Sequence, residues 1–354
     1  MSVDNLRVEL IRAKLNELLE AKFTEEILAS TVPHYFNRKS LMTTNKTSVT
    51  IPAGMVLEID DSIYSLDTAK TLSITSLSST GKDVYVYAVV NNGALDFVVS
   101  LNGTVPSGYN ADNSRKIGGF HCLCANVGTI SGHKLSGYVA GDILPASVWD
   151  LMHRPKCSPE GMVYIDKCDI WMDIYLNSWN GSKLVSVNGG TTADGASTKK
   201  FHGEQFVERL ADIDKRLPWR HEFQIAAKGS NEATNIQGSA DVNTTGGHVD
   251  TAGRRMISDY GLEDACGFLW QWASDVGVNG SSGWNDSVYN SGVDDQSYGR
   301  SYGTLYRARL GGDWAYGSGC GSRSVSVYST SANVFSHDGG RGACEPKNCE
   351  VNYN

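Results

Sequence analysis

Short runs of β-branched residues, broken by turn residues, constrain the fold of this chain most. The runs SVTIPAGMVLEID, TLSITSL, DVYVYAVV and ALDFVVSL lie within residues 45–130 and are separated by Gly, Asn, Asp and Ser. Val, Ile and Thr favour strands, and turns this frequent connect neighbouring strands as hairpins. The pattern predicts an antiparallel β-sandwich or barrel, and because no ionisable cluster stands out there, we interpret residues 45–140 as a spacer domain.

A helical pattern precedes these strands, over residues 5–29. Its apolar positions recur at spacings of three and four, and they are Leu6, Leu10, Ile11, Leu15, Leu18, Leu19, Phe23, Ile27 and Leu28. This spacing predicts one amphipathic helix of about seven turns. The apolar stripe either packs on the rest of its own chain or joins copies of itself in a short bundle. We therefore assign residues 1–44 to assembly or attachment.

From about residue 145 the chain becomes rich in Trp and Gly and loses long periodic segments. All eight Trp lie between residues 149 and 314, as expected for an irregular core that needs large side chains. The segments GEQFVERLADID and WRHEFQIAAKG predict two short helices, whereas residues 229–255 and 277–300 show no periodicity. Loops this long in a compact domain are usually functional or structurally elaborate.

Charge and hydropathy exclude two classes of partner. The net charge is −8, and Lys and Arg do not cluster, which argues against nucleic-acid binding. No apolar run approaches a membrane span, and Met1–Glu9 is too polar to begin a secretory signal. The chain is expected to be made in the bacterial cytoplasm and not to insert into a membrane.

The eight cysteines do not show the spacing of a metal site. Cys122 and Cys124 are too close for a zinc knuckle, and no second pair has the CxxC spacing. We interpret the cysteines as buried thiols, while Cys344 and Cys349 have a spacing that would close a small loop in an oxidising setting.

Three segments of the C-terminal half match one pattern in its order along the chain. RLPWRHEFQIAAKG (216–229), CGFLWQWASD (266–275), and GGDW followed by SRS and GGRGAC resemble the C-type-lectin-like fold of formylglycine-generating enzymes. The resemblance implies that residues 141–354 form a C-type-lectin-like ligand-binding domain. The expected fold class is α+β and multi-domain, with an N-terminal helix, an antiparallel β-sandwich spacer and this C-terminal fold.

A closer resemblance covers most of residues 45–344. SRKIGGFH (114–121), RPKCSPEGMVYIDKCDIWMDIYL (154–176) and the whole of 311–344 are similar to the phage major tropism determinant family, whose C-terminal residues are diversified by a retroelement. This implies a hypervariable receptor-binding protein at the tip of a phage tail fibre. Implied partners are a host-surface protein or glycan, a tail-fibre protein, and further copies of the chain in a homotrimer. The N-terminus departs from the family, which begins with a β-rich attachment domain.

Residues 311–344 mix two kinds of position at a spacing of two. Alternate side chains of an extended strand face opposite sides, so this spacing predicts an inward and an outward set. The inward set is Val325, Val327, Ala332, Val334 and Ser336, with Trp314 and Trp270 as core. The outward set includes Ser326, Tyr328, Asn333, Phe335 and His337. The alternative is an ordinary irregular loop region whose aromatic residues are partly buried.

The family resemblance assigns diversified, ligand-binding roles position by position. Randomised adenines in Asn codons of this family yield Tyr, Phe, Ser, Gly, Ala, Asp, His and Asn, and never Lys, Glu, Gln, Met or Trp. Tyr among Ser, Gly and Asn is also typical of a paratope. Arg323 and Arg341 are expected to be structural. The twelve positions, all within the allowed set and all expected to face outward, are Asp313, Ala315, Tyr316, Gly317, Gly319, Ser326, Tyr328, Ser329, Asn333, Phe335, His337 and Asp338.

Catalysis and metal binding are disfavoured alternatives. The enzymatic branch of the lectin-like family binds copper through two cysteines shortly after its Gly-Gly pair, and here that region holds Cys320 alone. We therefore predict no catalytic residues and no cofactor, and an oxidase is the enzymatic alternative. The alternative to a phage protein is a prophage- or cell-encoded surface adhesin of the same fold. The acidic loop 285–295 is either a Ca²⁺ site, through Asp286, Asp294 and Asp295, or a solvated loop.

Overall fold

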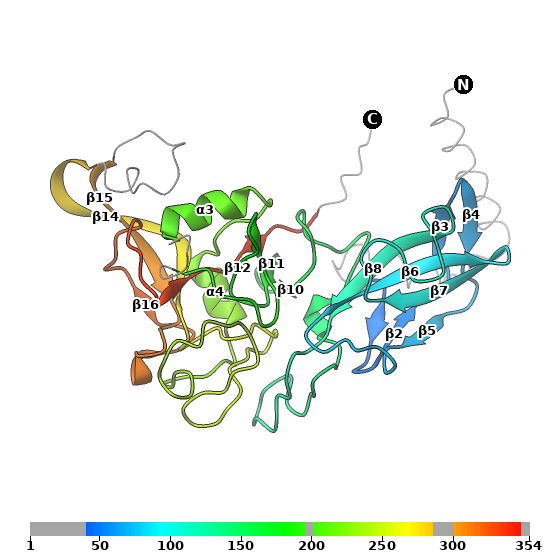
Figure 1. The fold of residues 1–354 in the computed structure, drawn as a ribbon, viewed down its shortest axis with the longest axis horizontal. Helices are drawn as coiled ribbons and strands as arrows, with labels where there is room; N and C mark the ends of the chain where they lie inside the picture. Colours follow the sequence, from blue (N-terminus) through cyan, green and yellow to red (C-terminus); the bar gives the residue numbers. More distant parts are fainter. Residues whose placement is uncertain (1–39, 195–200, 286–300, 348–354) are drawn as a thin grey trace.

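The computed structural model describes residues 40–194, 201–285 and 301–347. Strands β1–β9 form one lobe, the sandwich lobe, and strands β10–β18 with helices α3 and α4 form a second, the C-terminal lobe (Figure 1). The described residues are mostly β, with α3 and α4 as their α-helices, rather than an even α+β mixture. The helix predicted over 5–29 lies outside them. No helix among them is long and apolar enough to cross a membrane.

The sandwich lobe consists of antiparallel sheets that enclose one apolar core. A four-stranded sheet of order β7-β6-β8-β9 packs against the sheet β1-β2-β5 and the hairpin β3-β4. Val84, Val86 and Ala88 of the long strand β6 alternate into this core, as a half-buried strand requires. The strands predicted over 45–130 are confirmed. They are β1 (Thr43–Thr44), β2 (Ser48–Ile51), β3 (Val56–Ile59), β4 (Ser62–Ser65), β5 (Lys70–Ser73), β6 (Asp83–Asn91), β7 (Ala94–Ser100) and β8 (Ser114–His121), followed by β9 (Trp149–Asp150).

The C-terminal lobe is built from small sheets joined by long irregular segments. Its largest sheet has the order β16-β15-β14-β17, in which β17 pairs with β14 in parallel. Residues 277–285, aperiodic in sequence, continue β14 into a hairpin with β15. The strands are β10 (Met162–Ile165), β11 (Ile170–Asp173), β12 (Ser178–Trp179), β13 (Leu184–Val185), β14 (Trp270–Asn285), β15 (Ser301–Leu310), β16 (Val325–Ser326), β17 (Asp338–Gly339) and β18 (Ala343–Cys344), with 3-10 helices η1 (Pro145–Ser147) and η2 (Gly317–Gly319).

Both short helices predicted in this lobe are present, as α3 (Gly203–Ala211) and α4 (Arg220–Ala226). A capping box starts α3, and Phe206 and Leu210, one turn apart, bury one face of it in the cluster that contains Trp272. In α4 the carboxylate of Glu222 accepts the backbone N–H of Trp219 at 2.8 Å and two bonds from Arg216 at 2.8 Å. This ion pair explains why Arg and Glu stand six residues apart in RLPWRHE.

The two lobes share a buried joint. The segment 123–144, between β8 and β9, contributes Leu123, Val127, Leu135 and Leu144 to the apolar core of the C-terminal lobe. The chain then returns to the sandwich sheet as β9. His121 of β8 bonds Asp83 at 3.0 Å through Nδ1 and the Tyr175 hydroxyl at 2.9 Å through Nε2. The lobes are therefore connected by apolar packing and by a buried polar chain.

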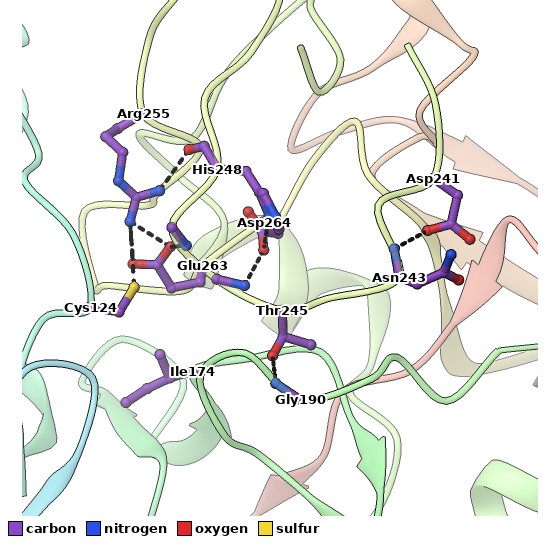
Figure 2. A network of polar contacts seen from close by, with 12 residues as sticks. Cys124, Ile174, Gly190, Asp241, Asn243, Thr245, His248, Arg255, Glu263 and Asp264 are labelled. Atoms are coloured by element: carbon purple, nitrogen blue, oxygen red, sulfur yellow. Dashed lines mark hydrogen bonds and ion pairs between the residues drawn. The ribbon is translucent and has the colours of Figure 1, made fainter. Parts of the chain in front are cut away.

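An ion-pair network holds the irregular part of the C-terminal lobe and reaches the joint (Figure 2). Arg255 donates from Nη2 to both Glu263 oxygens, at 2.7 and 2.6 Å, and lies 3.8 Å from the Cys124 sulfur. Asp264 accepts from the backbone of Gly246 at 2.7 Å and from His248 at 2.9 Å. The long segment 229–255 is therefore held by specific hydrogen bonds and ion pairs rather than by regular secondary structure, since buried polar groups need partners.

Candidate functional site

Residues 311–344, which we name the variable segment after the family resemblance, are anchored to the C-terminal lobe at three points. This segment pairs with β15 through β16, with β14 through β17, and with β11 through β18. Between these short pairings the chain makes turns, for example from Thr330 to Asn333 and from Phe335 to Asp338. Loops held by a sheet in this way can vary in sequence while their anchors keep their position.

Large aromatic side chains dominate the exposed part of this segment. The exposed fraction is 88% for Tyr328, 55% for Tyr316 and 39% for Phe335. Phe335 stacks on the His337 ring at 4.9 Å, and Tyr316 meets Trp270 edge to face at 5.1 Å. Ala315 and Gly319 are also exposed, whereas Gly317, Ser326, Asn333 and His337 are partly buried.

Three of the twelve predicted positions are buried, so the prediction that they face outward is wrong. Asp338 is fully buried and accepts a 2.6 Å bond from Arg309. Asp313 accepts the backbone N–H of Ala315 at 2.8 Å, and Ser329 is 4% exposed. Asp313 and Asp338 therefore hold the loops through polar bonds beneath the surface.

The inward set is also wrong for its valines. Val325, Val327 and Val334 are 41%, 68% and 39% exposed. Side chains alternate only where the backbone is extended, and in this part of the segment the structure assigns a strand only to Val325–Ser326. Both neighbours can therefore face solvent, as Val327 and Tyr328 do. Of the predicted core residues, Trp270 is buried and Trp314 packs half-buried against the cluster of Phe268 and Leu269.

Charged groups of the segment are neutralised beneath its surface. Burial raises the pKa of Asp338 to about 7, against the opposing effect of the Arg309 guanidinium. Arg309 lies over the rings of Trp270 and Trp272, 5.6 and 5.8 Å from their centroids, and its Nη2 donates to Ser326 at 3.3 Å. Burial also lowers the pKa of His337. The exposed rings of Tyr316, Tyr328 and Phe335, which we name the aromatic surface, carry no charge, and the exposed charged side chain of the segment is Arg323.

The closing Arg341 is structural, as predicted. Its side chain is fully buried and donates to the Gln271 side chain at 3.0 Å and to three backbone carbonyls. These carbonyls belong to Asp173 at 2.7 Å, Glu263 at 2.6 Å, and Ile174. One side chain thus ties β11, the irregular segment and the end of the variable segment together. Arg323 is exposed, and among the described residues no hydrogen bond or ion pair is recorded for it, so the structural role predicted for Arg323 is wrong.

The structure adds neighbours that the sequence did not single out. A cavity of about 350 Å³ opens between the β14–β15 hairpin and residues 327–328, lined by Val276, Tyr306 and Tyr328 among others. Trp284 and Tyr302 on the hairpin are 63% and 61% exposed and meet edge to face at 5.6 Å. The available signal was compositional, because aromatic residues among Ser, Gly and Asn continue from 277 to 306.

The other predicted sites are buried or lie elsewhere. Burial raises the pKa of the Cys320 thiol to about 12, so it is protonated at neutral pH. Cys349 and the acidic residues Asp286, Asp294 and Asp295 lie outside the described residues. Within 40–194, 201–285 and 301–347, no three His, Cys, Asp or Glu side chains are grouped to hold a metal ion.

Comparisons with known proteins cover both lobes. A family model described as the second domain of Mtd matches residues 39–150. A tail fiber receptor-binding protein of Bordetella phage BPP-1 is 30% identical over an alignment of 326 residues, which covers 85% of this chain and 81% of that protein. Solved structures of the U1 and M1 variants of Major Tropism Determinant match with TM-scores of 0.74, at 29% and 30% identity, over 88% of this chain and 84% of each of theirs.

Proposed function

Because the chain belongs to the major tropism determinant family, represented by a phage tail fiber receptor-binding protein, we propose that it binds a receptor on a bacterial surface. The protein acts as a binding module rather than an enzyme. Residues 141–354 are the ligand-binding domain of the C-type-lectin-like fold, and 45–140 are the spacer that sets it away from the particle.

The exposed aromatic cluster on an anchored segment is the observation that carries this proposal. Tyr328, Tyr316 and Phe335 project from loops that three short strand pairings and the buried Arg341 hold in place. A rigid base reduces the ordering cost of binding, and Tyr offers a large contact area at low entropy cost.

We assign the twelve positions to two roles. Asp313, Ser329 and Asp338 shape the loops from beneath, since their side chains are buried. The remaining nine contact the ligand, and the apolar cavity beside Tyr328 extends their surface. The contacting residues are Ala315, Tyr316, Gly317, Gly319, Ser326, Tyr328, Asn333, Phe335 and His337.

We also propose that the chain is a homotrimer at the tip of a tail fibre. The apolar stripe over 5–29 needs a partner surface, and several copies would convert weak single contacts into useful avidity. Light scattering on the purified chain tests this part, with a trimer expected and a monomer at micromolar concentration contradicting it.

Cell binding tests the function itself. Fluorescently labelled purified chain is mixed with whole cells of a panel of bacterial strains. We expect saturable binding to a subset of strains that an excess of unlabelled chain displaces. Absence of saturable binding to every strain, including those infected by phage that carry this chain, would contradict the proposal.

A further inference from the structure

A second cavity lies on the C-terminal lobe, apart from the aromatic surface and beside the loop that carries Ser322 and Arg323. Its volume is about 520 Å³, and segments far apart in the sequence line it. Lys134 comes from the segment between β8 and β9, Lys167 from the turn between β10 and β11, Lys228 from the end of α4, and Arg323 from the loop before β16. Clefts at such junctions are frequent ligand sites.

The lining is strongly cationic in a chain of net charge −8. Lys134, Lys167, Lys228 and Arg323 are all exposed, and among the described residues no ion pair within 4 Å is recorded for any of them. Cations that converge without a carboxylate partner repel one another. A bound oxyanion would relieve this repulsion.

The nearby carboxylates are engaged elsewhere. Asp259, the one acidic residue of the lining, accepts the backbone N–H of Lys134 at 3.1 Å and lies 3.7 Å from His133 Nε2. Glu232 accepts the hydroxyl of Ser322 at 2.7 Å and its backbone N–H at 3.2 Å. Both bonds to Glu232 order the loop that carries Arg323, so this carboxylate positions the arginine through the backbone.

The volume of the cavity and its lining side chains favour a sugar over a bare ion as the ligand. The volume is many times the roughly 30 Å³ of one water molecule, so a bare ion would leave most of the cavity unfilled. Ile225 offers an apolar wall for a sugar ring, and Gln224 offers an amide for its hydroxyls. The buried Tyr260 ring is covered by Lys134, whose Nζ lies 4.8 Å from the ring centroid. Lys side chains act as point charges for phosphate or carboxylate, and Arg adds a bidentate fork.

We propose that this cavity, the basic pocket, binds a saccharide that bears a phosphate or a carboxylate on the host surface. The host-surface source rests on the proposed receptor binding. Arg323 belongs to the variable segment but not to the twelve diversified positions, so the basic pocket stays constant while the aromatic surface changes. Binding at the constant basic pocket would raise the effective concentration of the host surface near the variable aromatic surface.

Titration calorimetry on the full chain tests the basic pocket without host cells. The probes are glucose 1-phosphate, galacturonate, neutral glucose and inorganic phosphate. We expect both acidic sugars to bind, neutral glucose not to bind, and inorganic phosphate to bind at least tenfold more weakly than glucose 1-phosphate. Equal binding of inorganic phosphate and glucose 1-phosphate would identify a free-phosphate site and overturn the sugar assignment.

Charge reversal locates the binding. Lys228→Glu and Lys167→Glu should each weaken glucose 1-phosphate binding at least tenfold, while Lys82→Glu, an exposed lysine of the sandwich lobe, makes the same charge change without effect. Unchanged thermal melts would show that the variants fold. Binding that survives both reversals, or that no acidic sugar shows, would overturn the proposal. Because no cells are used, failure here leaves receptor binding untouched, and failure of cell adsorption leaves this result untouched.

Discussion

Arg341 carries a charge in a place where charges are costly. Burial lowers the pKa of its guanidinium to about 10, so it remains protonated at neutral pH, and four acceptors surround it. Removing one partner of such an arrangement leaves buried carbonyls without donors. The residue therefore works as a structural clamp, which its position in the closing GGRGAC already indicated.

Replacing this clamp should destabilise the lobe strongly. We expect Arg341→Met to lower the free energy of unfolding by about 3–5 kcal/mol, because several buried acceptors lose their donors at once. Denaturant unfolding followed by tryptophan fluorescence measures it. Arg323→Met removes the same charge from an exposed position and should change stability by less than about 0.5 kcal/mol. Equal effects of the two variants would contradict this role.

His153 should make the protein sensitive to acid. Its ring is packed between Tyr164 and Trp171, and burial lowers its pKa to about 4, although Asp150 opposes this. The folded state then binds fewer protons than the unfolded state between pH 4 and 6.5, so its contribution to stability is present above 6.5 and lost as pH falls to about 4.

The test compares pH profiles of variants. His153→Gln should remove up to about 3 kcal/mol of the loss in unfolding free energy between pH 6.5 and 4. His221→Gln, an exposed histidine, should leave the profile unchanged. If His153→Gln and wild type lost stability equally over this range, the ring would not be buried in its neutral form.

The spacing of apolar residues along the chain predicted those strands and helices whose buried residues lie close together in sequence. The β-branched runs over 45–130 became strands, and GEQFVERL became α3 because Phe206 and Leu210 lie one turn apart on one face. The variable segment was harder, since alternation has meaning only in an extended strand. Its orientation depends on pairings with β15, β14 and β11, whose partners lie up to 173 residues away by sequence number and leave no local signal.

Polar partners at long range were equally hidden. Asp is one of the residue types allowed at a diversified position, but the Asp338 carboxylate is buried and accepts a hydrogen bond from Arg309 of β15. The network of Arg255 and Glu263 gave no periodic signal either, because irregular segments satisfy their polar groups one contact at a time.

The double glycine at the start of the variable segment sets the turn that leaves β15. Gly311 and Gly312 have φ of +92° and +87°, and a Cβ on Gly311 would lie 2.6 Å from the backbone oxygen of Ala265. Gly311→Ala should therefore cost about 1–3 kcal/mol. In contrast, a Cβ on Gly277 meets no atom within 4 Å, so Gly277→Ala should be close to neutral. Thermal melts compare the two, and the reverse ranking would contradict the turn assignment.

At the scale of the whole molecule, the sandwich lobe and the C-terminal lobe form a connected support. Residues of the segment between β8 and β9 pack into the core of the C-terminal lobe, and the Asp83–His121–Tyr175 chain crosses between the lobes. The aromatic surface and the basic pocket both lie on the lobe that the spacer supports. We therefore infer that the buried networks hold the ligand-binding loops in fixed positions, while a few exposed side chains contact the ligand.

Attachment of aromatic-truncation variants to receptive cells tests this account most directly. Tyr316→Ala, Tyr328→Ala and Phe335→Ala should each weaken cell binding by about 2 kcal/mol, or thirtyfold, as expected for interface anchors. Val139→Ala, which trims an exposed valine remote in sequence from the variable segment, should leave binding unchanged. If binding survived all three aromatic truncations but was lost on Leu101→Ala in the sandwich lobe, the receptor surface would lie on that lobe and the central claim would be wrong.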